Sequence, residues 1–272
     1  MGFRVTPVLA AEQLRVFEET TEKALDEVGD KYGSGYPYFK GGRERILSYH
    51  NLNHTKAVRR GAAALAGALE LSPSERTVAD LAAAAHDIVQ LKPRGVMEAE
   101  SAAWLEYELA KSNLFSSRLL KALDVGAVAA LAVLGTEPVF TDGGFAQRVD
   151  QLSFPSRSAE LIARAVACGD MREIHAPTGP LVAHQLWQEM EGLTPDQQPD
   201  LTSLVDFQTR QIELASNYRY PHERGEEVFG ALRGEVVGYH EQVVGRLEIG
   251  DIATFGQLLN EDEAFGFRYL GR

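Results

Sequence analysis

Two histidines four residues apart are followed, about thirty residues later, by a histidine next to an aspartate. The first two are His50 and His54, and the adjacent pair is His86 and Asp87. Neutral imidazoles and carboxylates are ligands that divalent transition metals favour. A metal ion held in this way can activate a water molecule as a nucleophile. These residues therefore predict metal-assisted hydrolysis.

A long amphipathic helix is predicted to carry the first two histidines. Several glycines and a proline break the chain between 33 and 42, so we expect the helix to begin near Arg43. Residues spaced by three, four or seven positions share one face of a helix. Both histidines then lie on the inward face, in a line formed by Leu47, His50, His54, Val58, Leu65 and Leu69.

The helix that carries the adjacent pair has a well-marked predicted start. Ser72 at the N-cap, Pro73 at the first helical position and Glu75 at the third form a capping box. The alanine-rich segment that follows can pack closely and ends at His86 and Asp87. Consecutive residues on a helix diverge by about 100°, but at a fraying helix end both side chains can reach one metal.

Another ligand has to come from later in the chain, and two aspartates are candidates. Asp170 ends a predicted helix over 157–170, and the apolar residues of that helix share its face. Asp150 is the alternative. We prefer Asp170 because its helix places it on an inward face.

The metal-ligand candidates resemble a known family. His54, the adjacent His86 and Asp87, and Asp170 are similar to the pattern of the HD superfamily of metal-dependent phosphohydrolases, over about residues 43–175. The resemblance implies an all-α fold, an HD-domain helical bundle, in which these four residues bind the metal. It also implies a part in catalysis for Asp87.

A second resemblance surrounds the first histidines. Tyr49-His50-Asn51 followed by His54 looks like the opening motif of the cyclic-nucleotide phosphodiesterases of that superfamily. The resemblance implies that His50 is catalytic and donates a proton to the leaving oxygen. A capping or supporting role for His50 is the alternative.

The chain also departs from this family. No histidine lies between Asp87 and Asp170, so the additional histidines of the superfamily's dinuclear phosphodiesterases and diiron oxygenases are missing. A one-metal site is favoured. Glu98 and Glu100 could bind a second metal, or they could be solvated charges at a helix start. No position matches a purine-gripping glutamine, which leaves a cyclic-nucleotide substrate open.

Two imidazoles and two carboxylates suit Mn²⁺, Fe²⁺, Co²⁺, Ni²⁺ or Zn²⁺, and suit Mg²⁺ less well. Lys92 and Arg94 follow the histidine-aspartate pair and could bind a substrate phosphate, or they could be solvated loop residues. We predict a phosphohydrolase that cleaves a phosphoester of a small molecule, with a nucleotide or cyclic nucleotide as the favoured substrate. The rivals are a nucleotide-binding sensor with a non-catalytic metal cage, and a metal-dependent oxygenase, against which the missing histidines count.

Helical periodicity dominates the whole chain, and no alternating strand pattern of useful length appears. We predict a single domain over 1–272, with a core at about 43–175, a joint at 195–200, and additional carboxy-terminal helices at about 200–272. Further helices are predicted at about 97–111, 116–134, 157–170, 181–192, 201–217, 224–246 and 254–261.

Composition limits the partners. A formal net charge of −12 argues against binding to long nucleic acids. The single cysteine, Cys168, excludes an intrachain disulfide. The longest apolar run, 125–134, is about half of what a membrane span requires, and no secretion signal is evident. We therefore expect a cytoplasmic protein, and the sequence leaves its oligomeric state open.

Overall fold

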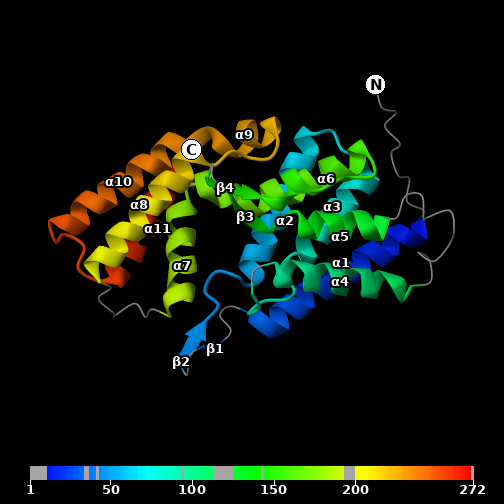
Figure 1. Ribbon diagram of the computed structural model, residues 1–272, viewed down its shortest axis with the longest axis horizontal. Coiled ribbons are helices and arrows are strands. Elements are labelled where there is room, and N and C mark those ends of the chain that lie inside the picture. The colour runs from blue at the N-terminus through cyan, green and yellow to red at the C-terminus, as the bar shows by residue number, and fades with distance from the viewer. Residues whose placement is uncertain are drawn as a thin grey trace. The chain divides into compact units, whose positions relative to one another are not determined.

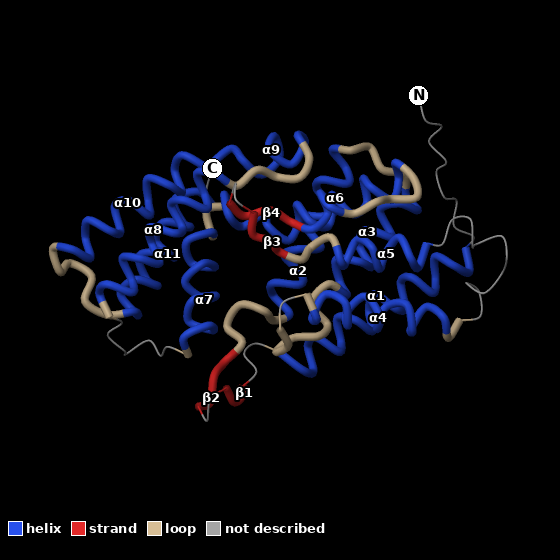
Figure 2. Tube along the Cα trace, viewed as in Figure 1, coloured by secondary structure: helices blue, strands red, loops and turns tan. Residues whose placement is uncertain are grey.

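The structure is a computed structural model that describes residues 11–33, 37–40, 43–93, 95–112, 125–141, 144–192 and 200–270. Helices account for most of these residues, and the strands among them form two short hairpins (Figure 2). The predicted all-α fold class is confirmed. Within the described residues, every helix is too short or too polar to cross a membrane.

The chain folds as two compact units that are each built from separated segments. The first comprises Met1–Gly33, His50–Met171 and Tyr220–Val228, and the second comprises Ser34–Tyr49, Arg172–Arg219 and Phe229–Arg272. The division into a core at 43–175 and an extension at 200–272 stays a prediction.

Helix α3 occupies a central place in the first unit. It spans Pro73–Ala85 and packs against α1 (Ala11–Tyr32), α2 (Leu52–Ala68), α5 (Val125–Leu134) and α6 (Arg157–Asp170), while α4 (Val96–Ala110) packs against α1 and α5 (Figure 1). The alanines at the end of α3 are fully buried, since methyl side chains let several helices approach one another. The carboxyl end of α3 therefore opens into the interior of this unit.

The predicted start of the helix that carries His54 was wrong. Strand β2 (Arg43–Ile46) pairs antiparallel with β1 (Pro37–Lys40), where a glycine-rich loop and the first helical residues had been predicted. Helix α2 begins only at Leu52, because the side chain of Asn51 accepts hydrogen bonds from the amides of Asn53, at 2.9 Å, and His54, at 3.4 Å. An asparagine in this position is a strong N-cap, which fixes the helix start.

The capping box of α3 is confirmed. The side chain of Ser72 accepts from the amide of Glu75 at 3.3 Å, and the side chain of Glu75 accepts from the amide of Ser72 at 2.7 Å. The helix ends at Ala85, with His86 as its C-cap. The histidine-aspartate pair thus leaves the helix at its last turn, as the sequence predicted.

Helices α2 and α6 meet at backbone distance. Gly169 lies so close to α2 that a Cβ atom at this position would be 2.6 Å from the amide nitrogen of Ala62 and 2.9 Å from the carbonyl oxygen of Val58. Glycine has no Cβ, so the two helices can touch here. The neighbouring Cys168 is also fully buried, with its Sγ atom beside Gly225.

The remaining helices follow the predictions in part. Helices α6 and α8 (Leu201–Asn217) match the predicted ranges, and α7 spans Gly179–Glu191. The helix predicted over 224–246 is interrupted by a 3₁₀ turn at Gly230–Leu232 that separates α9 (Glu223–Phe229) from α10 (Arg233–Glu248). Glycine is a poor helix former, which is consistent with a break at Gly230.

Two further differences concern a helix end and a hairpin. Helix α11 spans Phe255–Leu270 and so extends beyond the predicted residue 261. A second hairpin, β3 (Pro138–Thr141) with β4 (Gly144–Gln147), had not been predicted. Within the predicted joint, 195–199 lie outside the described residues, and Asp200 caps α8.

The second unit has an apolar core and a chain of buried polar side chains. Residues of α7, α8, α10 and α11 form the apolar core. Within it, Asp262 accepts hydrogen bonds from His184 Nδ1 at 2.6 Å and from the Tyr239 hydroxyl at 2.8 Å. Gln208 contacts His184 through its side-chain nitrogen and accepts from His240 Nδ1, at 2.7 Å, through its oxygen. These hydrogen bonds connect all four helices.

Candidate metal centre

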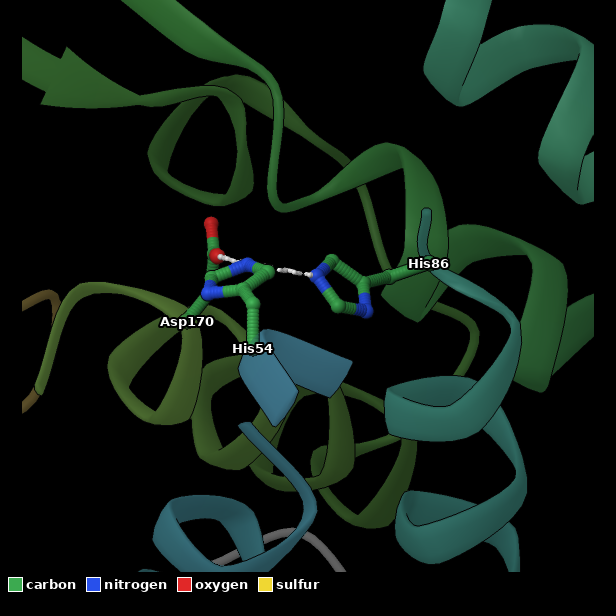
Figure 3. Close-up of side chains that lie close together, drawn as sticks. All are labelled: His54, His86 and Asp170. Carbon is green, nitrogen blue, oxygen red and sulfur yellow. Dashed lines mark hydrogen bonds and ion pairs between the residues drawn. The ribbon is translucent and has the colours of Figure 1, made fainter. Parts of the chain in front are cut away.

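Two of the predicted ligands face each other inside the first unit. His54 lies in the first turn of α2, and His86 is the C-cap of α3. Their Nε2 atoms are 3.3 Å apart, and both side chains are buried. Figure 3 shows the two rings converging with Asp170 on one point. Residues 32 positions apart in sequence are thus brought together by the packing of α2 against α3.

Asp170 is the last residue of α6 and completes a group that can hold a metal ion. Its Oδ1 atom lies 3.4 Å from His54 Nε2 and 3.7 Å from His86 Nε2. One ligand atom from each of the three residues lies within 4.8 Å of the other two. The contact between α2 and α6 at Gly169 explains this placement, because it sets the residue before Asp170 directly against α2.

Asp87 lies against the same two imidazoles. Its Oδ2 atom is 3.1 Å from His86 Nε2 and 3.3 Å from His54 Nε2. These contacts lack hydrogen-bond geometry, and among the described residues this buried oxygen has no hydrogen-bond partner. A buried carboxylate oxygen without a donor is costly unless a cation neutralises it. Asp87 therefore has the surroundings expected of a metal ligand.

The spacing of the donor atoms fits a first-row divalent ion. Adjacent donors lie about 3.0 Å apart in an octahedral site with bonds of about 2.1 Å, and about 3.4 Å apart in a tetrahedral one. The contacts of His54 and His86 with the two carboxylates and with each other range from 3.1 to 3.7 Å. Most of these distances lie close to the spacing expected of neighbouring donors around one ion.

A backbone contact orients the imidazole of His86. Its Nδ1 atom lies 2.8 Å from the carbonyl oxygen of Ala83, to which it donates. Nδ1 therefore carries a proton, and in the neutral imidazole the lone pair of Nε2 points at the centre of the cluster. Metal-binding histidines are held in the same way by a hydrogen bond from their second ring nitrogen.

The electrostatics of the cluster favour a cation at its centre. Burial lowers the pKa of His54, but Asp170 and Asp87 raise it by more, to about 10. Burial likewise lowers the pKa of His86, while Asp87 and Asp170 produce a net rise. Burial raises the pKa of Asp87, and the histidines hold it well below its usual range. The two carboxylates thus attract positive charge, whether as protons on the histidines or as a metal ion.

His50 lies beside the cluster without being part of α2. It precedes the N-cap residue Asn51, so the prediction that His50 and His54 share one helix was wrong. The rings of the two histidines nevertheless meet edge to face, with centroids 5.8 Å apart. His50 therefore reaches the edge of the cluster from a loop, and its role as a proton donor stays a prediction.

The structure separates the two candidate aspartates. Asp150 lies in a 3₁₀ helix (Arg148–Gln151), and its Oδ1 atom pairs with Arg164 at 2.7 Å. Its side chain is half exposed, whereas that of Asp170 is largely buried beside the histidines. The geometry thus favours Asp170 as the ligand.

The predicted phosphate-binding residues are described only in part. Lys92 is exposed, and its Nζ atom is 3.9 Å from Glu100 Oε1. Arg94 lies outside the described residues. Glu98 caps α4 by accepting from the amide of Gly95 at 2.8 Å, which is the role of a helix-start charge.

Glu137 lies beside Gly95, at the start of α4, where a Cβ atom on Gly95 would be 2.8 Å from Glu137 Oε1. Burial raises the pKa of Glu98, and the charges of Asp87 and Glu137 raise it further. Glu137 also pairs with Arg148. No spacing rule relates Glu137 to Glu98, and their proximity comes from the packing of α4 against α5.

Comparison of the chain with protein-family models, with curated proteins and with solved structures finds no match. The functional interpretation therefore depends on the residues and their geometry.

Proposed function

We propose that this protein is a divalent-metal-dependent phosphohydrolase of the HD type. The observation that supports the proposal is the convergence of His54, His86 and Asp170, with Asp87, from three helices onto one point. Two imidazoles and two carboxylates form a donor set that suits Mn²⁺, Fe²⁺, Co²⁺, Ni²⁺ or Zn²⁺. Within this proposal the four residues hold one metal ion.

The same residues suit hydrolysis. When bound, a divalent ion supplies a Lewis acid and lowers the pKa of a water molecule. Asp87 and Asp170 keep 18% and 16% of their side-chain surface exposed, so the cluster is partly accessible to solvent. His50 stands at the edge of the cluster, where it can protonate a leaving oxygen. The side chain of Lys92 is exposed to solvent and can approach a substrate phosphate.

The proposed substrate is a small cytoplasmic phosphoester, with a nucleotide or cyclic nucleotide favoured. The net charge of −12 disfavours long polynucleotides, because a protein that binds them neutralises many phosphates at once. A single phosphate group needs only the metal and one or two cations. Monoesters and diesters both satisfy this chemistry, so both belong in the test.

Matched aspartate variants test the metal site. We expect His86→Ala, Asp87→Asn and Asp170→Asn to lose bound Mn²⁺ or Zn²⁺ and to lose hydrolysis, since each removes a donor from a site with few others. Asp150→Asn is the control and should keep both. Metal content by elemental mass spectrometry and affinity by titration are the measurements. Full metal occupancy in the three ligand variants would refute the site.

A substrate panel tests the reaction. Chelator-treated protein should be inactive. Added Mn²⁺ or Co²⁺ should restore release of phosphate and nucleoside from nucleoside monophosphates, ring opening of cyclic nucleotides to nucleoside monophosphates, or release of nitrophenol from nitrophenyl phosphoesters. EDTA should stop the reaction. Metal binding without any metal-dependent product in the panel would contradict hydrolysis and support the nucleotide-sensor alternative.

A further inference from the structure

The backbone that follows the histidine-aspartate pair is held by side-chain hydroxyls. After α3 ends, the amide of Ile88 still bonds to the carbonyl of Ala85 at 3.3 Å. The next peptide groups lie outside any helix or strand. Buried backbone groups in such a segment need other partners, and in this protein α1 and α4 provide them.

Tyr32, the last residue of α1, holds two of these groups at once. Its hydroxyl donates to the carbonyl oxygen of Ile88 at 3.2 Å and accepts from the amide of Gln90 at 3.0 Å. The phenol ring is buried, so the position of the hydroxyl is fixed by packing. One rigid side chain thus bridges both ends of the segment 88–90.

Ser101 of α4 binds the other side of the peptide group whose carbonyl Tyr32 binds. Its hydroxyl, which is fully buried, accepts from the amide of Val89 at 3.2 Å. Gln90 continues the connection back to the metal cluster, because its side-chain nitrogen donates to the carbonyl oxygen of Asp87 at 3.4 Å. The segment immediately after Asp87 is therefore restrained from two helices and by its own side chain.

We propose that Tyr32 and Ser101 are positioning residues that set the place of the Asp87 carboxylate in the metal site. This inference rests on the proposed function. The Oδ2 atom of Asp87 must stay within a few tenths of an ångström of its position to bind the ion. Asp87 itself lies after the end of α3 and directly before the restrained segment 88–90. Groups that hydrogen-bond directly to a metal ligand typically contribute 10-fold to 100-fold in metal affinity or activity, and a restraint on the adjacent backbone should act at the lower end of that range.

The test uses Tyr32→Phe and Ser101→Ala in the full chain, with Thr20→Val as the control. Thr20 is also buried on α1 and donates to the carbonyl oxygen of Val16 at 2.7 Å, away from the segment 88–90. Mn²⁺ affinity is measured by titration, and the visible absorption of bound Co²⁺ reports the ligand geometry. Amide hydrogen exchange follows Val89 and Gln90.

We expect Tyr32→Phe to weaken Mn²⁺ binding by about 10-fold or more, to change the Co²⁺ spectrum, and to speed exchange at Gln90. Ser101→Ala should act alike, with faster exchange at Val89, and Thr20→Val should match the wild type in all three. Two variants guard against a folding failure of either. Unchanged affinity and spectrum in both, in a wild type that binds metal, would overturn the inference and leave the proposed function intact. A wild type that binds no metal would instead overturn the proposed function, and the inference with it.

Discussion

At the scale of single residues, substitution of His50 can distinguish catalysis from metal binding. The ring of His50 lies edge to face with that of His54, from the loop that precedes α2. By contrast, His54, His86 and Asp170 offer donor atoms within 4.8 Å of one another, and Asp87 contacts both histidines. A proton donor does not need to contact the metal, but it must reach the leaving oxygen. His50 has a position suited to this role, and a kinetic experiment can test it.

We expect His50→Ala to retain the metal and to lower kcat by about 10²-fold to 10⁴-fold for a phosphoester with a poor leaving group. The defect should shrink by about an order of magnitude for a nitrophenyl phosphodiester, whose leaving group needs little protonation. Steady-state rates for the two substrates, with metal content measured alongside, check this. Equal defects would exclude proton donation, and loss of metal would make His50 a ligand.

Residue types and spacing were sufficient to predict the cluster itself. His54, His86 and Asp170 come together in the structure as expected. The capping box of α3 and the apolar face of α6 led to His86 and Asp170, whereas the start of the helix of His54 was predicted wrongly. The supporting contacts could not be predicted in this way. Tyr32 lies 56 residues from Ile88 in sequence, and only the packing of α1 reveals that they touch.

At the scale of elements, the touching backbones of α2 and α6 control the site. Gly169 leaves no room for a side chain against Ala62, and its neighbour Asp170 is a proposed ligand. Backbone atoms cannot rotate away from an added methyl group as a flexible side chain can. An alanine at this position must therefore move one helix.

We expect Gly169→Ala to destabilise the protein by about 1–3 kcal/mol through overpacking and to weaken metal binding, because it separates α2 from α6 beside the ligands. Gly67→Ala is the control on α2: nothing lies within 4 Å of a Cβ atom there. That substitution should stabilise the helix by up to about 1 kcal/mol. Chemical denaturation measures the free energy of unfolding of both variants, and titration measures their metal affinity. If Gly169→Ala matched Gly67→Ala in both quantities, the contact between α2 and α6 would not control the site.

The errors in predicting the elements also have local causes. The spacing of Leu47 and His50 led to a predicted start of the His54 helix that was too early in the sequence. The side chain of Asn51 caps the helix and fixes its start at Leu52. The short hairpins carry too few residues for an alternating pattern to stand out. A break such as the one at Gly230 depends on the surrounding packing, which local propensity does not report.

At the scale of the whole molecule, the second unit has its own pH dependence. Burial and the neighbouring His184 together lower the pKa of His240 to about 3. His240 faces Gln208 in the polar chain that continues through His184 to Asp262 and Tyr239. Its imidazole is neutral in the folded state, and it becomes protonated near pH 6.5 when the chain unfolds.

Because of this difference in pKa between the folded and unfolded states, the protein loses stability as the pH falls. The contribution of His240 to stability is complete above pH 6.5 and is lost as the pH falls toward 3, because the unfolded chain then binds an additional proton. Between pH 6.5 and about pH 5 the free energy of unfolding should fall by about 2 kcal/mol from this group. His240→Gln should lack that part of the slope.

Trp187 in the core of the second unit reports the transition by fluorescence in a Trp104→Phe background. Urea denaturation at several pH values then compares this protein with its His240→Gln variant. Identical slopes in the two would show that His240 titrates alike in the folded and unfolded states.

The burial of Cys168 makes the chain convenient for site-directed labelling. It is the only cysteine, its side chain has no exposed surface, and burial raises the pKa of its thiol. Maleimides and iodoacetamides react with thiolates, so the folded protein should be nearly inert to them. A cysteine introduced at the exposed position of Tyr107 would then be the single labelled site for a spin label or fluorophore. The distance from this label to a paramagnetic ion in the proposed site could be measured without any other substitution.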